Sequence, residues 1–386
     1  MNDGTLNNTS IRFIGIIDGD CVNEFDGKKT ENGIMIPISV SAPEGCRLTL
    51  NNIPMSENCG TYTSEIEICG YRNTLTVKDH TNNSQATIRL FYLKNATGKF
   101  RFSSDDNILF LWDINEHKDE YKSIFDNPYL AIYKKAHDLY GAKVHLNLFY
   151  EFDDTARKNF SSNRPYFNLS MMTDKFKDEF AANSDWLKLA FHSNSEFPDA
   201  PYDSASAEKI VEDCIRVHRE IIRFAGKDSI SNSTTTHWGS GTLECMRALR
   251  SLGYTSFTGY FDIINGKGLV SYYVPVEICD HINKRDFWCD TEEDIFYGRI
   301  DRVTNLGTLE SVMDTVKEVV ADPHRGGFVS VMIHEQFYHS DYCGYLPDFE
   351  ERILAPCRYL HEHGYVGSHI TEAMREPSLN ENVRFK

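Results

Sequence analysis

The stretch Phe100-Arg-Phe-Ser-Ser-Asp105-Asp106 marks the point at which the chain changes character. It has the pattern of a strand that ends in two adjacent carboxylates. Before residue 98, short β-rich runs alternate with turn clusters, and after it strand-like and helix-like segments alternate. A chain of 386 residues is long enough for two domains. We therefore predict an all-β domain over residues 1–97 and an α/β domain over residues 98–386.

The first domain is predicted to be an antiparallel β-sandwich. Apolar and polar residues alternate along runs such as Gly33-Ile-Met-Ile-Pro-Ile-Ser-Val and Asn73-Thr-Leu-Thr-Val, and Asn- and Gly-containing turns separate the runs. Residues 34–95 resemble bacterial immunoglobulin-like modules that are attached to carbohydrate enzymes. In those modules an Asn-rich turn is followed by a Gly-Thr-Tyr strand and a Gly-x-Asn-Thr-Leu strand. The resemblance implies an immunoglobulin-like fold.

The second domain is predicted to be a (β/α) barrel, because repeated strand–helix units form a parallel sheet with helices outside. The first predicted helix has Asp126 as N-cap, Pro128 in its first turn and Gly141 past its end. The predicted strands cover residues 100–105, 143–150, 186–191 and 328–333. The predicted helices cover residues 127–139, 175–182, 206–224, 243–252, 309–321 and 349–361.

Charge and composition exclude several classes of partner. A net charge of −17 argues against nucleic-acid binding, which needs a basic surface, and equally against anionic membranes. No apolar run is long enough to cross a bilayer, and the segment 1–8 lacks the features of a secretory signal. None of the ten cysteines forms a Cys-x-x-Cys pair, so we expect free, mostly buried thiols and a cytoplasmic protein.

Three distant segments are candidates for one metal site. They are Phe102-Ser-Ser-Asp105-Asp106, Phe191-His192-Ser-Asn-Ser-Glu196 and Val331-Met-Ile-His334-Glu335. Each follows an apolar strand, and the carboxyl ends of barrel strands meet at one face. Nitrogen and oxygen ligands suit zinc first, with cobalt, nickel, manganese or iron as alternatives. The sequence therefore predicts one divalent metal ion and metal-assisted hydrolysis.

Residues 98–370 resemble the polysaccharide deacetylase family (carbohydrate esterase family four, chitooligosaccharide deacetylase-like). Phe102-Ser-Ser-Asp-Asp-Asn corresponds to its Thr-Phe-Asp-Asp-Gly motif, and His192-Ser-Asn-Ser-Glu196 to its His-Ser/Thr-x-x-His motif. Thr236-His-Trp-Gly-Ser stands at its Arg-Pro-Pro-Tyr-Gly segment, and Val331-Met-Ile-His-Glu at its final Leu-His motif. The resemblance implies a distorted (β/α) barrel and removal of acetyl groups from a carbohydrate.

The resemblance also implies residue roles. Asp105 would be the general base and His334 the general acid, and Asp106, His192 and Glu196 would bind the metal. The remaining candidates are predicted to contact the carbohydrate substrate: His237, Trp238, Glu151, Glu335 and Asp113. Aromatic side chains such as Trp238 commonly stack on sugar rings.

Several departures from the family pattern leave alternatives open. Glu196 replaces the second His of the metal triad, and the Arg that orients the base has no counterpart, since Thr236 or His237 stands there. Asp113 is a rival for Asp105, because it also ends an apolar run. One alternative is a barrel that lost catalysis and binds carbohydrate. Another is glycoside hydrolysis, which needs two carboxylates, such as Glu151 with Asp105 or Glu335.

Overall fold

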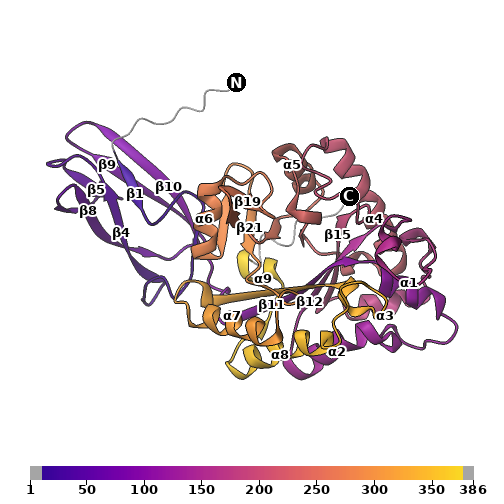
Figure 1. Ribbon diagram of the computed structural model, residues 1–386. Helices are drawn as coiled ribbons and strands as arrows, with labels where there is room; N and C mark the ends of the chain where they lie inside the picture. Colours follow the sequence, from indigo (N-terminus) through magenta and orange to yellow (C-terminus); the bar gives the residue numbers. More distant parts are fainter. Residues whose placement is uncertain (1–10, 377–386) are drawn as a thin grey trace.

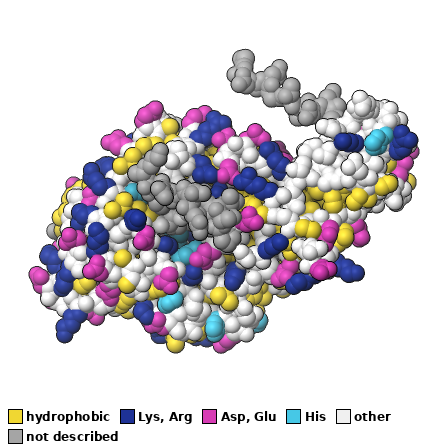
Figure 2. Space-filling model, turned by 180° about the vertical axis from the view of Figure 1, so that it is seen from behind, with side chains coloured by type: hydrophobic (Ala, Val, Ile, Leu, Met, Phe, Trp, Pro, Cys, Tyr) yellow, Lys and Arg dark blue, Asp and Glu magenta, His cyan; other side chains and the backbone are white. Residues whose placement is uncertain are grey.

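The computed structural model describes residues 11–376 and shows a mixed α/β protein (Figure 1). A β-rich end, carrying β1, β4, β5, β8, β9 and β10, projects from a larger body of strands and helices. Seen from behind the view of Figure 1, the surface carries interspersed basic and acidic side chains (Figure 2). None of the helices within residues 11–376 is long and apolar enough to cross a membrane. The segment 1–8 lies outside the described residues.

Two sheets pack against each other in the β-rich end. The first is antiparallel and contains β1 (Arg12–Ile14), β3 (Lys28–Lys29), β4 (Ile34–Ser41), β7 (Ser56–Asn58) and β8 (Thr61–Ile68). Along β4, Ile34, Ile36, Ile38 and Val40 are buried and alternate with less buried residues, as expected of a strand with one face in a core. They join a single apolar cluster with residues of the second sheet, such as Leu75 and Leu90.

The second sheet crosses the domain boundary that was predicted at residue 97. Its nine strands, in spatial order, are β16 (Ser233–Thr234), β17 (Ser256–Gly259), β21 (Ile295–Arg299), β20 (Phe287–Asp290), β2 (Asp20–Val22), β10 (Ser84–Tyr92), β9 (Arg72–Asp79), β5 (Leu48–Leu50) and β6 (Ile53–Pro54). The crossing point is the antiparallel pair β2 and β20, where Asp20 lies opposite Trp288. Hydrogen bonds of one sheet therefore connect the β-rich end to the larger body.

A third, parallel sheet places the candidate residues. Its order is β15 (Leu187–Ser193), β12 (Val144–Phe149), β11 (Lys99–Asn107), β23 (Phe328–His334) and β22 (Arg302–Val303), and β24 (Val366–Gly367) also pairs with β11. Asp105 lies opposite His334 in the register of β11 and β23. The carboxyl ends of β11, β15 and β23 thus meet at one edge, as the sequence predicted.

Single hydrogen bonds link this parallel sheet to β16, β17 and β21. Leu189 forms a parallel bridge with Ile230, just before β16. On the other side, the link runs through two consecutive residues. Ile300 N donates to Gly259 O of β17, and Asp301 N donates to Ser330 O of β23. Two short hairpins add β13 (Glu151–Phe152) with β14 (Phe167–Asn168) and β18 (Asp262–Ile264) with β19 (Lys267–Leu269).

The predicted helices are present, with ends shifted by a few residues at most. They are α2 (Pro128–Tyr140), α3 (Lys177–Ala182), α4 (Ala207–Phe224), α5 (Leu243–Ser251), α7 (Leu309–Ala321) and α8 (Phe349–Glu362). Asn127, and not Asp126, is the N-cap of α2, because its side chain accepts the Leu130 N–H. The patterns of α1 (Leu109–Glu116), α6 (Val276–Arg285) and α9 (Ile370–Met374) were not recognised. All ten cysteines are free, and six of them are buried, as expected.

Candidate metal centre

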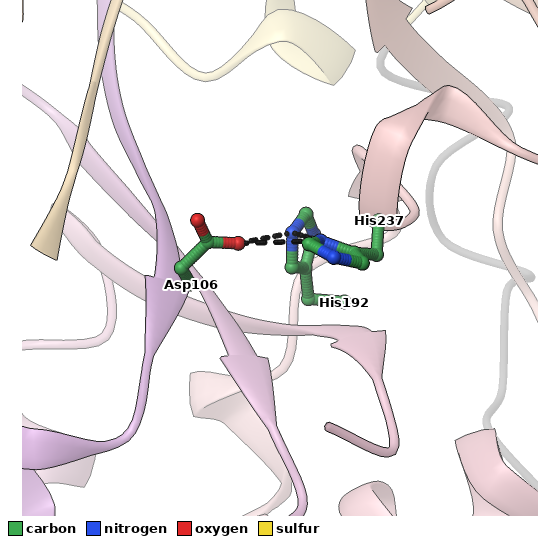
Figure 3. Close-up of side chains that lie close together, drawn as sticks. All are labelled: Asp106, His192 and His237. Atoms are coloured by element: carbon green, nitrogen blue, oxygen red, sulfur yellow. Dashed lines mark hydrogen bonds and ion pairs between the residues drawn. The ribbon is translucent and has the colours of Figure 1, made fainter. Parts of the chain in front are cut away.

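Three buried side chains point their ligand atoms at one another (Figure 3). Asp106 Oδ1 lies 3.0 Å from His192 Nε2 and 3.3 Å from His237 Nδ1. The two histidine nitrogens are 3.2 Å apart, and the three ligand atoms all lie within 4.8 Å of one another. One carboxylate and two imidazoles at this spacing could hold a metal ion.

A local irregularity in β11 aims the two adjacent carboxylates differently. The pairing of β11 with β12 shifts register between Ser104 and Asn107, and Asp106 takes a left-handed backbone conformation with φ of 61°. Asn107 secures this bulge by donating from Nδ2 to Ser104 O at 2.7 Å and to Asn147 O at 3.1 Å. Bulges of this kind re-aim side chains next to functional sites. Asp106 consequently faces the histidines, and Asp105 faces β12.

The second nitrogen of each histidine is committed to a backbone carbonyl. His192 Nδ1 lies 2.5 Å from Thr235 O, and His237 Nε2 lies 2.8 Å from Glu196 O. A carbonyl only accepts, so each of these nitrogens carries the proton and donates it. In the neutral rings, His192 Nε2 and His237 Nδ1 then present lone pairs to the Asp106 carboxylate. Such outer hydrogen bonds are typical of metal-binding histidines, and either a metal ion or a proton would offset the repulsion among the facing lone pairs.

The electrostatics of the trio agree with this reading. Burial alone would raise the pKa of Asp106, but the facing His192 and His237 bring that pKa well below its usual value. Burial would lower the pKa of His192, and Asp106 raises it above its usual value. Without metal, a proton shared with an imidazole can take the place of the positive charge.

Asp105 and His334 lie beside the trio but are held by other groups. Asp105 is buried and accepts a 2.6 Å hydrogen bond from Asn147 Nδ2. His334 Nδ1 lies 2.9 Å from Asn305 Oδ1, to which it donates, and its Nε2 is 4.0 Å from Asp106 Oδ2. Both residues line the same open pocket as the trio. His334 thus presents Nε2 to the space above Asp106.

His237, and not Glu196 as predicted, is the third member of the buried group. Glu196 also lines the pocket, but its carboxylate is not part of the three-residue group. Burial and then the charge of Asp106 raise the pKa of Glu196 to about 9. The sequence predicted His237 as a substrate contact and not as a metal ligand. The usable signal was its position, since it follows the short strand β16 as His192 ends β15.

The other predicted substrate contacts fall into two groups. Trp238 lies on the pocket rim and is 53% exposed. Glu151 lines a smaller adjoining cavity and accepts from Asn194 Nδ2 and from Tyr166 OH. Tyr342 and Gln336 border both hollows, and Gln336 Nε2 donates to Asp106 Oδ2 at 2.8 Å.

Glu335 and Asp113 form hydrogen bonds that hold α1 and its neighbours, and they do not line the two hollows described above. The buried Glu335 carboxylate accepts from the backbone N–H groups of Ile108, Leu109 and Phe110 at 2.6–2.8 Å, so it caps the start of α1. Burial raises its pKa to about 7. Asp113 Oδ2 accepts from Tyr121 OH and from Asn127 Nδ2. Both carboxylates therefore have structural partners.

Comparisons with known proteins place the chain only loosely. No protein-family model matches it, and no curated protein matches it. Among solved structures, it is similar to a CE4 family pseudoenzyme from Bacillus anthracis, with 13% identity, a TM-score of 0.32, and coverage of 73% of this chain and 67% of that chain. It is also similar to a putative alpha-galactosidase from Bacteroides fragilis, with 10% identity, a TM-score of 0.24, and coverage of 92% and 79%. Scores this low carry no argument about fold or function.

Proposed function

We propose that this protein is a metal-dependent hydrolase that removes acetyl groups from a carbohydrate. The observation that carries the proposal is the buried trio Asp106, His192 and His237, flanked by Asp105 and His334 in one open pocket. The acetyl group and the carbohydrate come from the motif resemblance to the polysaccharide deacetylases. Aromatic side chains on the pocket lining, among them Trp238 and Tyr342, suit a sugar.

We further propose that the fold is a distorted (β/α) barrel preceded by an immunoglobulin-like sandwich. In support of the barrel, β11, β12, β15, β16, β17, β21, β22 and β23 follow one another through parallel pairs and single hydrogen bonds. In support of the sandwich, two sheets share one apolar cluster. The two proposed domains, which meet in the sequence at residue 97, share the nine-stranded sheet.

In the proposed mechanism, Asp106, His192 and His237 would hold one divalent ion, with zinc as the first candidate for an N₂O donor set. When bound, the ion would polarise the acetyl carbonyl and acidify a water molecule. Asp105, held by Asn147, accepts the proton of the attacking water. His334, oriented by Asn305 through Nδ1, carries a proton on Nε2 to the departing group. Glu196 and Gln336 shape the wall beside Asp106.

A second candidate function is carbohydrate binding without catalysis. It is favoured by the absence of any arginine hydrogen-bonded to Asp105 among residues 11–376. The glycoside hydrolase alternative loses one of its proposed pairs, because Glu335 is buried under α1. Its other pair, Glu151 with Asp105, is split between the smaller cavity and the main pocket.

Acetate release from N-acetylated chito-oligosaccharides by the zinc-loaded protein tests the proposal. We expect Asp105→Asn to lower the rate at least about 100-fold, the usual contribution of a general base. Asp138→Asn, an exposed change on α2, should leave it unchanged. Elemental analysis should find about one metal per chain. Metal binding and oligosaccharide binding without acetate release would instead support the second candidate, and a chain that binds no divalent metal would contradict both the metal centre and the hydrolase.

A further inference from the structure

Asn147 makes a direct hydrogen bond to Asp105 from within the sheet. Its Nδ2 donates to Asp105 Oδ1 at 2.6 Å, and both side chains are buried. The orientation of the amide follows from Asp105, because a carboxylate only accepts and the NH₂ group must therefore point at it. Asn147 Oδ1 then faces His145 Nε2 at 2.9 Å, whereas the nearby Thr234 hydroxyl donates to Phe191 O.

The strand register explains why these groups meet. In the parallel pair β11–β12, Ser103 lies opposite His145, and alternate residues of a strand share a face. His145 and Asn147 therefore lie on the face that carries Ser103 and Asp105. The backbone of Asn147 is itself tied to the β11 bulge, since its carbonyl accepts from Asn107 Nδ2. The donor and the carboxylate are thus held by the same pair of strands.

A buried cation lies further down the same face of β11. Arg101 is 1% exposed, donates from Nη1 to Ser330 Oγ at 3.1 Å, and has no hydrogen-bond partner at Nε or Nη2 among the described residues. Burial lowers its pKa to about 10, and the charge of Asp105 is the first group that opposes this effect. Arg101 stays charged at neutral pH, and the alternation of β11 places it on the face that carries Ser103 and Asp105.

His145 completes the chain of donors. Burial and then the charge of Arg101 hold its pKa well below the usual value, so the ring is neutral. The tautomer with the proton on Nε2 is the one that satisfies Asn147 Oδ1. The direction of donation is then His145 to Asn147 to Asp105, and hydrogen bonds in such a chain polarise one another.

We infer that Asn147 is the positioning residue of Asp105, with His145 holding the amide oxygen of Asn147, at a base to which no arginine among residues 11–376 donates a hydrogen bond. The inference rests on the proposed function only in that Asp105 is taken as the base. By occupying Oδ1, Asn147 leaves Oδ2 to face the pocket. A base held at one oxygen is fixed in rotation, and misplacement of a catalytic group by about 1 Å can cost about 100-fold in rate.

Asn147→Asp tests the inference with little change in volume. The variant keeps an acceptor for His145 but replaces the amide donor to Asp105 with a second carboxylate. With zinc-loaded protein and acetylated chito-oligosaccharide, we expect kcat to fall about 100-fold and KM to stay within about threefold. Bound zinc should stay at the wild-type level, because Asp106, His192 and His237 are untouched. In crystals, the Asp105 carboxylate should leave its wild-type position.

Controls separate this role from a general loss of structure. Ser103→Ala changes a buried side chain on the same face whose Oγ has no hydrogen-bond partner among the described residues, and it should keep wild-type kcat. If Asn147→Asp does not fold, Asn147→Ser removes the donor with a smaller side chain and should give the same result. An unmoved Asp105, or an unchanged kcat, would overturn the inference. If the wild type itself releases no acetate, the proposed function fails, and the crystallographic result still decides whether Asn147 positions Asp105.

Discussion

Asp106 faces two imidazoles whose remaining nitrogens are both committed to backbone carbonyls. This arrangement makes His237 the third candidate ligand, and the Glu196 backbone carbonyl is the acceptor for His237 Nε2. The side chain of Glu196 lines the pocket wall. The distinction between the two residues is sharp enough to test by metal binding alone.

We predict that His237→Ala weakens zinc binding more than about 100-fold, beyond the 10- to 100-fold effect typical of outer partners. Glu196→Gln should keep binding within about tenfold, because it preserves the shape of the side chain and the backbone carbonyl that accepts from His237. Isothermal titration with zinc measures both. A Glu196→Gln protein that loses zinc while His237→Ala keeps it would return the third ligand to Glu196.

Residue types and positions made part of this site predictable. Asp105, Asp106, His192 and His334 end apolar strands, and parallel strands bring their ends together, so the sequence indicated a shared pocket. The β11 bulge that turns Asp106 toward the histidines has no comparable sequence signal. The position of His237 after a short strand was a signal, but the loop geometry that carries it inward depends, like the bulge, on long-range packing.

At the scale of elements, α1 shows how a tertiary contact overrides local pattern. Residues 108–112 form an apolar run in which no helix was predicted, yet Leu109–Glu116 is helical. The Glu335 carboxylate, more than 200 residues away, accepts the first N–H groups of that helix. Short-range pattern does not contain this contact, which is why Glu335 and Asp113 were assigned to the substrate. Long amphipathic helices such as α4, with its own Ser206 cap, were predictable because their signals are local.

Two loops that border the pocket are joined by an ion pair. Arg164 donates from Nη2 to Asp341 Oδ1 at 2.5 Å and from Nε to Oδ2 at 2.8 Å. Ser161 N also donates to Asp341 O, and Phe160 pairs with Tyr342. The Arg164 guanidinium holds the pKa of Asp341 well below its usual value. Phe160 and Tyr342 line the smaller cavity, so this pair supports the wall of the site.

We predict that Asp341→Asn lowers the free energy of unfolding by about 2 kcal/mol at pH 7, as for a hydrogen bond between charged groups. A carboxyl with a depressed folded pKa stabilises the fold above its unfolded pKa of about 3.9, and this contribution is lost as pH falls below that value. The difference between the two proteins should therefore stay constant from pH 7 to 5 and shrink below about pH 4. Urea unfolding over that pH range measures it. A gap that closes already between pH 7 and 5 would contradict this assignment.

At the scale of the whole molecule, the nine-stranded sheet makes the β-rich end and the larger body one hydrogen-bonded unit. The residue pattern changes near residue 97, and the strands that local alternation predicted before that point are present. The pairing of β2 with β20 joins residues more than 260 positions apart. Such non-local pairing cannot be read from local periodicity.

A buried ion-pair cluster lies at this junction. Asp20 of β2 is fully buried, with Oδ1 at 3.1 Å from His281 Nε2 and 3.4 Å from Arg285 Nε. Arg285 also reaches Asp26 at 2.9 Å, and His324 lies 2.7 Å from the same carboxylate. Removing one member of a buried pair leaves the other charge uncompensated, which commonly costs about 3–5 kcal/mol. Because Asp26 still faces Arg285, the lower end of that range applies.

We predict that Asp20→Asn lowers the free energy of unfolding by about 3 kcal/mol and destabilises both parts of the molecule together. Hydrogen exchange in increasing urea, followed on peptides from β4 and from β23, should show both midpoints falling by the same amount. The matched control is Lys29→Ala, which removes an exposed pair with Glu24 and should change neither midpoint. If only the β4 peptides respond, the two parts unfold independently and the shared sheet does not couple them. If both respond, the junction transmits stability from the β-rich end to the strand that carries His334.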